Sequence, residues 1–183
     1  MKNVIKATKI IAKILEVLHW VAAGVMALVA VCSFAAPRWL TFVLDPGADR
    51  PGVANVYGFE TTITDAAGNL SVKALFLAAL GAGLLYALMA MIFRNIYLII
   101  KRSESGSPFQ KDNIRMVREI GIFSIAMPVV GLIMSVIIRL ALGPDAVETM
   151  VNLSGFVTGI VVLSLTQFFA YGAGLERDVD GLL

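Results

Sequence analysis

Four long apolar stretches separated by charged segments constrain this chain more than any other feature. A helix that crosses a bilayer needs about 20 mostly apolar residues, because the hydrocarbon core is about 30 Å thick and each residue rises about 1.5 Å. Four stretches meet that requirement: 17–36, 74–93, 120–138 and 151–171. The composition agrees, since 58% of the residues are hydrophobic and 15% are charged, against about 45–50% and about 25% in soluble domains. The sequence predicts an all-α membrane protein, a bundle of four transmembrane helices.

The first stretch also has features of a cleaved signal peptide, because it follows a lysine-rich start and ends in small residues. Its apolar run is longer than the core of a signal peptide, which has about 7–15 residues, and Pro37 follows the small residues directly. We therefore interpret it as a retained span. The 183 residues then form a single transmembrane domain. It has an outer loop at 37–72, a cytoplasmic loop at 94–119 and a cytoplasmic tail at 172–183.

The lysines and arginines predict the orientation of the spans, because cytoplasmic loops hold the excess of these residues. Eleven of the fifteen precede the first span, separate the second from the third, or lie in the tail: Lys2, Lys6, Lys9, Lys13, Arg94, Lys101, Arg102, Lys111, Arg115, Arg118 and Arg177. The other four are Arg38, Arg50, Lys73 and Arg139. We therefore expect a multi-pass protein of the bacterial inner membrane with both termini in the cytoplasm (N-in, C-in).

Small residues at helical spacing predict where the spans pack. Helices in lipid associate where small side chains let their backbones approach, and every span has a stripe of such residues, with a GxxxG match in the fourth. The residues expected at helix contacts are Ala79, Gly83, Pro128, Gly131, Gly155 and Gly159. Pro128 should also kink its helix, because proline removes a backbone hydrogen bond. A homo-oligomer, in which some stripes face a second copy, is an open alternative.

The outer loop combines β-forming residues with turn-forming residues. Branched and aromatic side chains in 57–64 and 70–72 flank a turn-forming segment at 65–69. This pattern is typical of a hairpin. We therefore expect a short β-hairpin in the outer loop, which becomes the first candidate for contact with something on the outer side of the membrane.

The cytoplasmic loop contains the signature of a helix start. Ser107 fits an N-cap, Pro108 the first helical position and Gln110 the third, where it would close a capping box. The helix would continue into the third span and turn Phe109 and Met116 toward the membrane. Its cations would then face lipid phosphates.

The N-terminal segment adds charged groups at the membrane boundary. Its first four lysines share one helix face, which predicts either a basic amphipathic helix lying on the anionic leaflet before it turns into the first span, or a signal that only sets topology. Glu16 and His19 lie three residues apart at the start of that span. They are a candidate proton-responsive pair, because histidine titrates near physiological pH. The alternative is an interfacial cap solvated by headgroups and water.

The cytoplasmic loop and the tail together resemble a known family. The similarity lies in Ser107-Pro-Phe-Gln with Ile114, Arg115 and Ile120-Gly121, and in the closing segment Phe168-Phe-Ala-Tyr-Gly-Ala-Gly-Leu-Glu-Arg-Asp-Val-Asp180. These segments are similar to the bacterial domain-of-unknown-function family numbered 2975. The resemblance implies a four-span membrane protein without an established activity, often encoded beside a small helix-turn-helix regulator. It transfers no catalytic residues. It indicates a cytoplasmic partner surface made of Ser107, Pro108, Phe109, Gln110, Arg115, Glu176, Asp178 and Asp180.

Residues that could carry chemistry are sparse. The sequence has no phosphate loop, no nucleophile elbow and no paired carboxylate within a span, and its one Cys and one His are too few for a dedicated zinc site. We therefore expect a non-enzymatic protein without a cofactor or direct contact with nucleic acid. It would act as an interaction or regulatory protein with a cytoplasmic partner. The alternatives are a subunit of a small oligomeric transporter or channel, and a quinone- or haem-linked redox protein.

Overall fold

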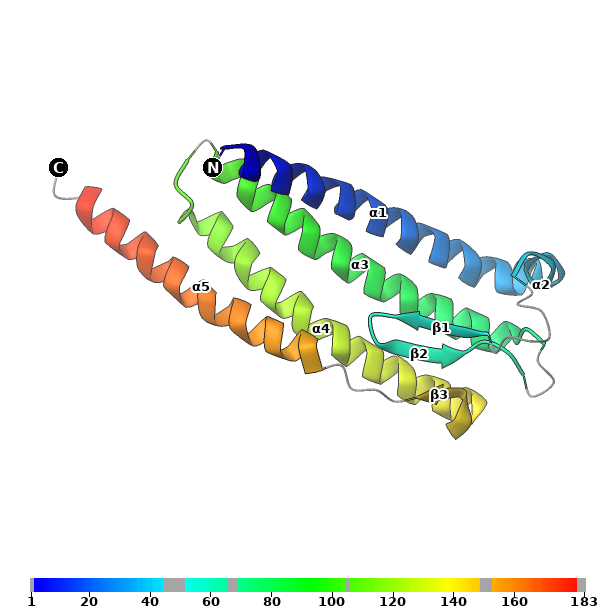
Figure 1. Ribbon diagram of the computed structural model, residues 1–183. Coiled ribbons are helices and arrows are strands. Elements are labelled where there is room, and N and C mark those ends of the chain that lie inside the picture. Colours follow the sequence, from blue (N-terminus) through cyan, green and yellow to red (C-terminus); the bar gives the residue numbers. More distant parts are fainter. Residues whose placement is uncertain (1, 45–51, 66–68, 105, 149–152, 181–183) are drawn as a thin grey trace. The chain divides into compact units, whose positions relative to one another are not determined.

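The computed structural model describes residues 2–44, 52–65, 69–104, 106–148 and 153–180. Four of its helices are long and apolar enough to cross a membrane (Figure 1). They are α1 (Lys2–Ala35), α3 (Val72–Ser103), α4 (Lys111–Leu142) and α5 (Leu153–Asp180). The prediction of an all-α, multi-pass membrane protein with four spans is therefore confirmed. Residues 151 and 152, where the fourth predicted span begins, lie outside the described residues.

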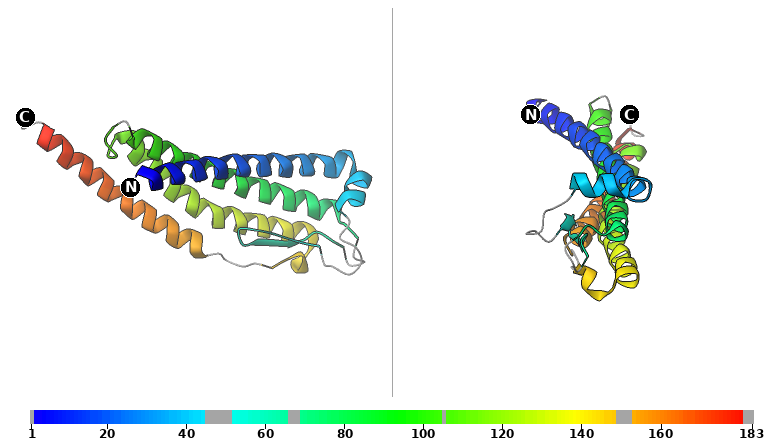
Figure 2. Two further views of the ribbon diagram at one scale, coloured as in Figure 1. Left: turned by 45° about the horizontal axis from the view of Figure 1, so that its top comes forward. Right: turned by 90° about the vertical axis from the view of Figure 1, so that its right-hand side faces the viewer.

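The long helices extend well beyond the predicted spans. α1 has 34 residues and α3 and α4 have 32 each, whereas about 20 suffice to cross the hydrocarbon core. α1 is one unbroken helix (Figures 1 and 2), so the prediction of an amphipathic segment that turns before the first span is wrong. No glycine or proline occurs before Gly24, and no helix-breaking residue therefore interrupts the first turns.

The connection between α3 and α4 is shorter than the predicted loop at 94–119. α3 continues to Ser103, and α4 starts at Lys111. We call the described residues between these helices, 104 and 106–110, the α3–α4 loop. The helix start predicted at Ser107 is therefore wrong by about one turn.

The chain divides into two compact units, each built from segments that are distant in the sequence. Unit 1 comprises Met1–His19, Leu88–Ala126 and Leu153–Leu183. Unit 2 comprises Trp20–Ala87 and Met127–Asn152. Unit 1 thus contains all of α5, whereas unit 2 contains the short helix α2 (Pro37–Leu44) and a small sheet.

The sheet in unit 2 has three antiparallel strands in the order β1, β2, β3. The strands are β1 (Val53–Val56), β2 (Phe59–Thr62) and β3 (Val147–Glu148), and the last follows a 3₁₀ turn, η1 (Pro144–Ala146). The predicted hairpin is confirmed, but its main turn lies at Tyr57 and Gly58, whose φ angles are 52° and 82°. Positive φ at both central residues is the geometry of the tight turn that joins two twisted strands.

The turn predicted at 65–69 is the site of a smaller pairing. Thr64 and Leu70 form an antiparallel bridge. The Asp65 N–H donates to the Asn69 carbonyl at 2.7 Å. Residues 66–68 lie outside the described residues.

The core of unit 2 joins the hairpin to the helices. Phe59 is 4% exposed and packs in one apolar cluster with Leu85, Met134, Ile138 and Val147. Gly81 provides the space for its ring, because a Cβ built there would lie 2.9 Å from Phe59 Cε1. The hairpin is therefore a packed part of unit 2.

The tip of the hairpin is also packed. The rings of Tyr57 and Tyr86 lie 5.9 Å apart in an edge-on contact. Burial raises the pKa of the Tyr57 hydroxyl above its ordinary value of 10.0, and Tyr86 adds to this shift. The Tyr57 hydroxyl is therefore neutral at physiological pH.

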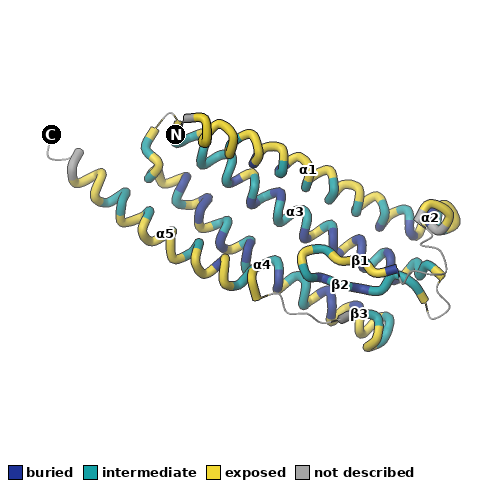
Figure 3. Tube along the Cα trace, in the orientation of Figure 1, coloured by how far each residue is buried: buried dark blue, intermediate teal, exposed yellow. Residues whose placement is uncertain are grey.

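The small residues predicted at helix contacts differ in what they touch within unit 2. Ala79 is 3% exposed. A Cβ built at Gly83 would lie 3.5 Å from Met26 Cβ of α1. Pro128 is buried and lines a hollow under the hairpin turn together with Gly131, but nothing lies within 4 Å of a Cβ built at Gly131. Among the four spans, α3 is the most covered and α5 the least (Figure 3), with 44% and 6% of their apolar windows buried.

Candidate functional site

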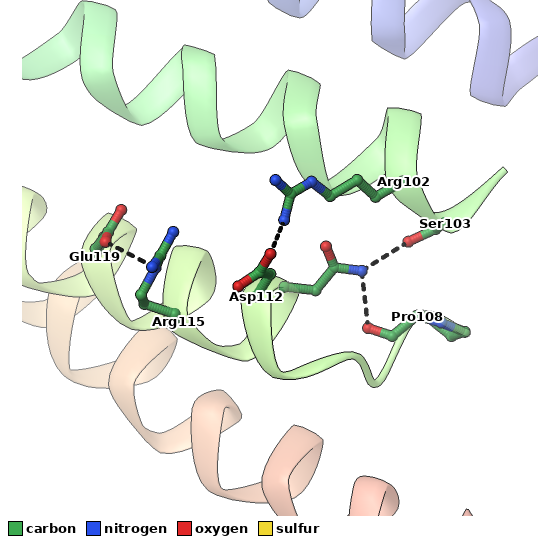
Figure 4. Close-up of polar contacts among 7 residues, drawn as sticks. Arg102, Ser103, Pro108, Asp112, Arg115 and Glu119 are labelled. Atoms are coloured by element: carbon green, nitrogen blue, oxygen red, sulfur yellow. Dashed lines mark hydrogen bonds and ion pairs between the residues drawn. The ribbon is translucent and has the colours of Figure 1, made fainter. Parts of the chain in front are cut away.

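The α3–α4 loop is fixed in unit 1 by a buried asparagine at the start of α4. Asn113 is fully buried, and its side-chain amide donates to the Pro108 carbonyl at 3.2 Å and to Ser103 Oγ at 3.4 Å (Figure 4). Next to it, Arg102 and Asp112 form an ion pair at 2.6 Å. One side chain thus ties the end of α3, the loop and the first turn of α4 together. Asn113 could not be identified from the sequence, since no spacing pattern distinguishes it from a solvated polar residue.

Ser107 joins the loop to α5 instead of capping α4. Its hydroxyl donates to Glu176 Oε2 at 2.6 Å and accepts from the N–H of Phe109 at 3.1 Å. The first helical hydrogen bond of α4 runs from the N–H of Ile114 to the Gln110 carbonyl. Gln110 therefore holds the position at which a helix is capped, and the predicted capping box around Ser107 is wrong. The Ser107 oxygen still accepts the N–H of Phe109, while its proton is donated to a residue 69 positions away.

Phe109 holds the loop against α5 from the apolar side. Its ring lies 5.8 Å from the ring of Phe169. A Cβ built at Gly172 would lie 2.8 Å from Phe109 Cε1, so the contact requires glycine there. Met116 is 3% exposed. The prediction that Phe109 and Met116 face the membrane is therefore wrong, because both side chains pack inside unit 1.

Two of the N-terminal lysines bind partners within unit 1. Lys9 Nζ lies 2.5 Å from Glu104 Oε2 in the α3–α4 loop. Lys13 Nζ lies 5.1 Å from the centre of the Tyr97 ring on α3, which is within the range of a cation–π contact. Lys6 is exposed, and the side chain of Lys2 lies outside the described residues. The lysine face of α1 is therefore partly used for contacts with α3 and the loop.

Glu16 and His19 each have a partner on α1. Glu16 is 8% exposed and pairs with Lys13 at 3.0 Å. His19 Nδ1 lies 2.7 Å from the Leu15 carbonyl, and the imidazole packs 5.1 Å from the ring of Phe93. A carbonyl only accepts hydrogen bonds, so Nδ1 carries the proton. The proton-responsive pair stays a prediction.

The residues predicted as a partner surface separate into two groups. The first group is connected by hydrogen bonds: Ser107 bonds to Glu176 and to the N–H of Phe109. Pro108 joins this group because its carbonyl accepts from Asn113. The others take no described part in that cluster: Gln110 and Asp178 are exposed, Arg115 pairs with Glu119 at 3.5 Å, and the side chain of Asp180 lies outside the described residues. The cluster of the first four residues is the candidate site, and we call it the loop–tail cluster.

Two glycines bring α4 and α5 together below this cluster. A Cβ built at Gly159 would lie 2.8 Å from the Gly121 carbonyl oxygen, and one built at Gly121 would lie 2.7 Å from Leu163 Cγ. The predicted packing residue Gly159 therefore lies at a helix crossing. Its partner Gly121 was not among the residues predicted to pack. Gly155 is half-buried.

No family model, curated protein or solved structure matches this chain.

Proposed function

We propose that this protein is a non-enzymatic interaction or regulatory protein of the bacterial inner membrane, with both termini in the cytoplasm. It binds a cytoplasmic protein through unit 1. The observation that carries the proposal is the folded α3–α4 loop, which is joined to α5 by the Ser107–Glu176 hydrogen bond and by the Phe109 ring over Gly172. A connection that merely links two spans needs no such structure.

The distribution of charge supports the orientation. All eleven lysines and arginines of the inner segments belong to the segments of unit 1, and the other four belong to unit 2. Positive residues are retained on the cytoplasmic side during insertion. In this proposal the positively charged segments, which include the α3–α4 loop, face the cytoplasm.

The rigidity of the loop supports binding. Binding residues are frequently loop residues held by a rigid scaffold, and a surface ordered in advance loses less conformational entropy when a partner docks. Here the buried Asn113 and the packed Phe109 fix the loop, while Pro108 and Gln110 are exposed. A small helix-turn-helix regulator is the partner that the sequence resemblance implies, and DNA would then be contacted by that partner.

A site-specific photo-crosslinker in living cells tests this function. A photoreactive amino acid in place of Pro108 should yield a crosslinked adduct with a cytoplasmic protein, identified by mass spectrometry. The same group in place of Asn55, which is exposed on β1, is the control and should give no such adduct.

A variant of Gly172 separates specific binding from mere proximity. Gly172→Leu displaces the Phe109 ring, because even a Cβ would overlap it. It should abolish the adduct without lowering the amount of protein in the membrane. An adduct of equal yield in Gly172→Leu would contradict the proposal. So would the absence of a cytoplasmic adduct when the photoreactive group at Pro108 is combined with the native Gly172.

The spans offer little support for a pore. The hydroxyls of Ser33, Ser124, Ser135, Ser164 and Thr166 each donate to a carbonyl three or four residues earlier in their own helix. Such hydroxyls are satisfied within the helix and are not needed as donors along a permeation path. We therefore make no second proposal of a transporter or channel subunit.

A further inference from the structure

A groove opens between α4 and α5 in unit 1, and its shape follows from the contacts at its two ends. The helices run antiparallel and touch at Gly121 and Gly159. About three turns away, the Phe109 ring fills the space over Gly172. Between these contacts lies a hollow of about 430 Å³, within the usual range of about 300–1,000 Å³ for ligand sites.

The walls of the groove combine positive charge with apolar surface. The lining residues are Lys111, Ile114, Arg115, Arg118, Leu163, Thr166, Gln167 and Ala170. Lys111, Arg115 and Arg118 are spaced four and three residues apart, which places them on one face of α4. Among the described residues that line the groove there is no carboxylate. An anionic group would therefore be attracted to this wall.

The carboxylates nearby are each shared with a group outside the groove. Asp112 pairs with Arg102, and Glu119 accepts from the side-chain amide of Asn95 at 3.0 Å. Glu119 also pairs with Arg115 at 3.5 Å, but that arginine side chain is 57% exposed, and exposed pairs of this kind are weak. Within the described residues, no ion pair is recorded for Lys111 or Arg118.

The groove lies where the polar end of unit 1 meets the apolar spans. The apolar run of α4 begins at Ile120, two residues after Arg118. On α5, Phe168 and Tyr171 are 70% and 69% exposed at the level of the lining residue Gln167. An exposed tyrosine such as Tyr171 is typical of the headgroup region of a bilayer. Toward the bilayer centre, Ile122 and Ile160 continue an exposed apolar surface.

We propose that this groove is a binding site for an anionic phospholipid. Arg118, Lys111 and Arg115 bind the phosphate, because charge-assisted hydrogen bonds from arginine and lysine to phosphate are strong. The acyl chains follow the apolar surface past Ile122. Basic pockets between transmembrane helices on the cytoplasmic side bind anionic headgroups in the same way. The site does not depend on the proposed protein partner.

Native mass spectrometry of the purified full-length protein tests the site. The protein is titrated in detergent with phosphatidylglycerol, and bound lipid is counted. Arg118→Gln and Lys111→Gln should each weaken binding about tenfold, which equals about 1.4 kcal/mol. Ala170→Trp, which fills the groove without changing its charge, should weaken binding similarly. Lys101→Gln removes an exposed cation outside the groove and should change the affinity less than about twofold, an amount worth only tenths of a kcal/mol.

Three results would overturn the proposal. An equal loss in Lys101→Gln would mean that general surface charge attracts the lipid. Equal binding of phosphatidylcholine, which carries no net charge, would remove the role of the cations. Displacement of phosphatidylglycerol by inorganic phosphate at the same concentration would identify a site for a soluble anion. Thermal unfolding of each variant verifies that it is folded. The lipid binding of each groove variant is compared with that of Lys101→Gln.

Discussion

At the scale of single residues, glycines matter where a second backbone or ring occupies the place of a side chain. Gly121 and Gly159 lie against each other's carbonyl oxygens, and close backbone contact is the usual basis of helix association in lipid. Gly131 has the same small-residue spacing, yet nothing lies within 4 Å of a Cβ at that position. Spacing alone therefore does not identify the glycines that pack.

This difference predicts opposite outcomes for two matched substitutions. Gly159→Ala places a Cβ 2.4 Å from Ile125 Cγ1, so it should destabilise the protein by about 1–3 kcal/mol, as overpacking usually does. Gly131→Ala meets no atom and should not destabilise it, since alanine favours a helix more than glycine. Thermal unfolding in the same detergent compares the two. Equal unfolding midpoints for the two variants would contradict the close contact between α4 and α5 at Gly159.

Phe59 supports a second prediction at this scale. Phe59→Ala removes a ring that is 4% exposed, and large-to-small changes of this kind cost about 3–5 kcal/mol. Val53→Ala, on β1 at 45% exposure, is the control and should cost less than about 1 kcal/mol because the side chain is largely outside the core. Equal unfolding midpoints for the two variants would show that the hairpin is not packed on the helices as described.

At the scale of elements, the long helices were predictable because each contains an uninterrupted apolar run. The hairpin turn was misplaced because 65–69 holds the usual turn residues, whereas the actual turn puts Tyr57 at a φ of 52°, a conformation that is uncommon outside glycine, asparagine and aspartate. The start of α4 was misplaced because Ser107 and Pro108 match a helix start by residue type, whereas the Gln110 carbonyl accepts the first helical hydrogen bond and Ser107 joins the loop to Glu176. Local patterns specify local structure, and they cannot encode a partner that far along the chain.

The contacts of the α3–α4 loop predict its resistance to proteases. Phe109→Ala removes the ring that packs on Phe169 and Gly172, so the loop should open more often and be cut faster by a protease of broad specificity. Asp178→Asn, an exposed change on α5, is the control and should leave the cleavage rate unchanged. A Phe109→Ala protein cut no faster than the control would contradict the view that this ring holds the loop.

At the scale of the whole molecule, the described chain leaves much apolar surface for lipid, as the low coverage of α1 and α5 illustrates (Figure 3). The sequence predicted the number of spans, and the same lysines and arginines that predict the orientation fall into the segments of unit 1. It indicated all four residues of the loop–tail cluster, but it did not predict that Asn113 and Gly172 hold them in place, because both act only through tertiary contacts.

The central claim is that the loop–tail cluster faces the cytoplasm, since a cytoplasmic partner could not otherwise reach it. Cys32 is the sole cysteine, so Cys32→Ser provides a background in which Asn55→Cys and Pro108→Cys can be labelled separately. In intact cells whose outer envelope admits the reagent, a maleimide that cannot cross the inner membrane should label Asn55→Cys. It should label Pro108→Cys only after the inner membrane is opened. Labelling of Pro108→Cys in intact cells, with Asn55→Cys protected, would invert the topology and contradict the proposed function.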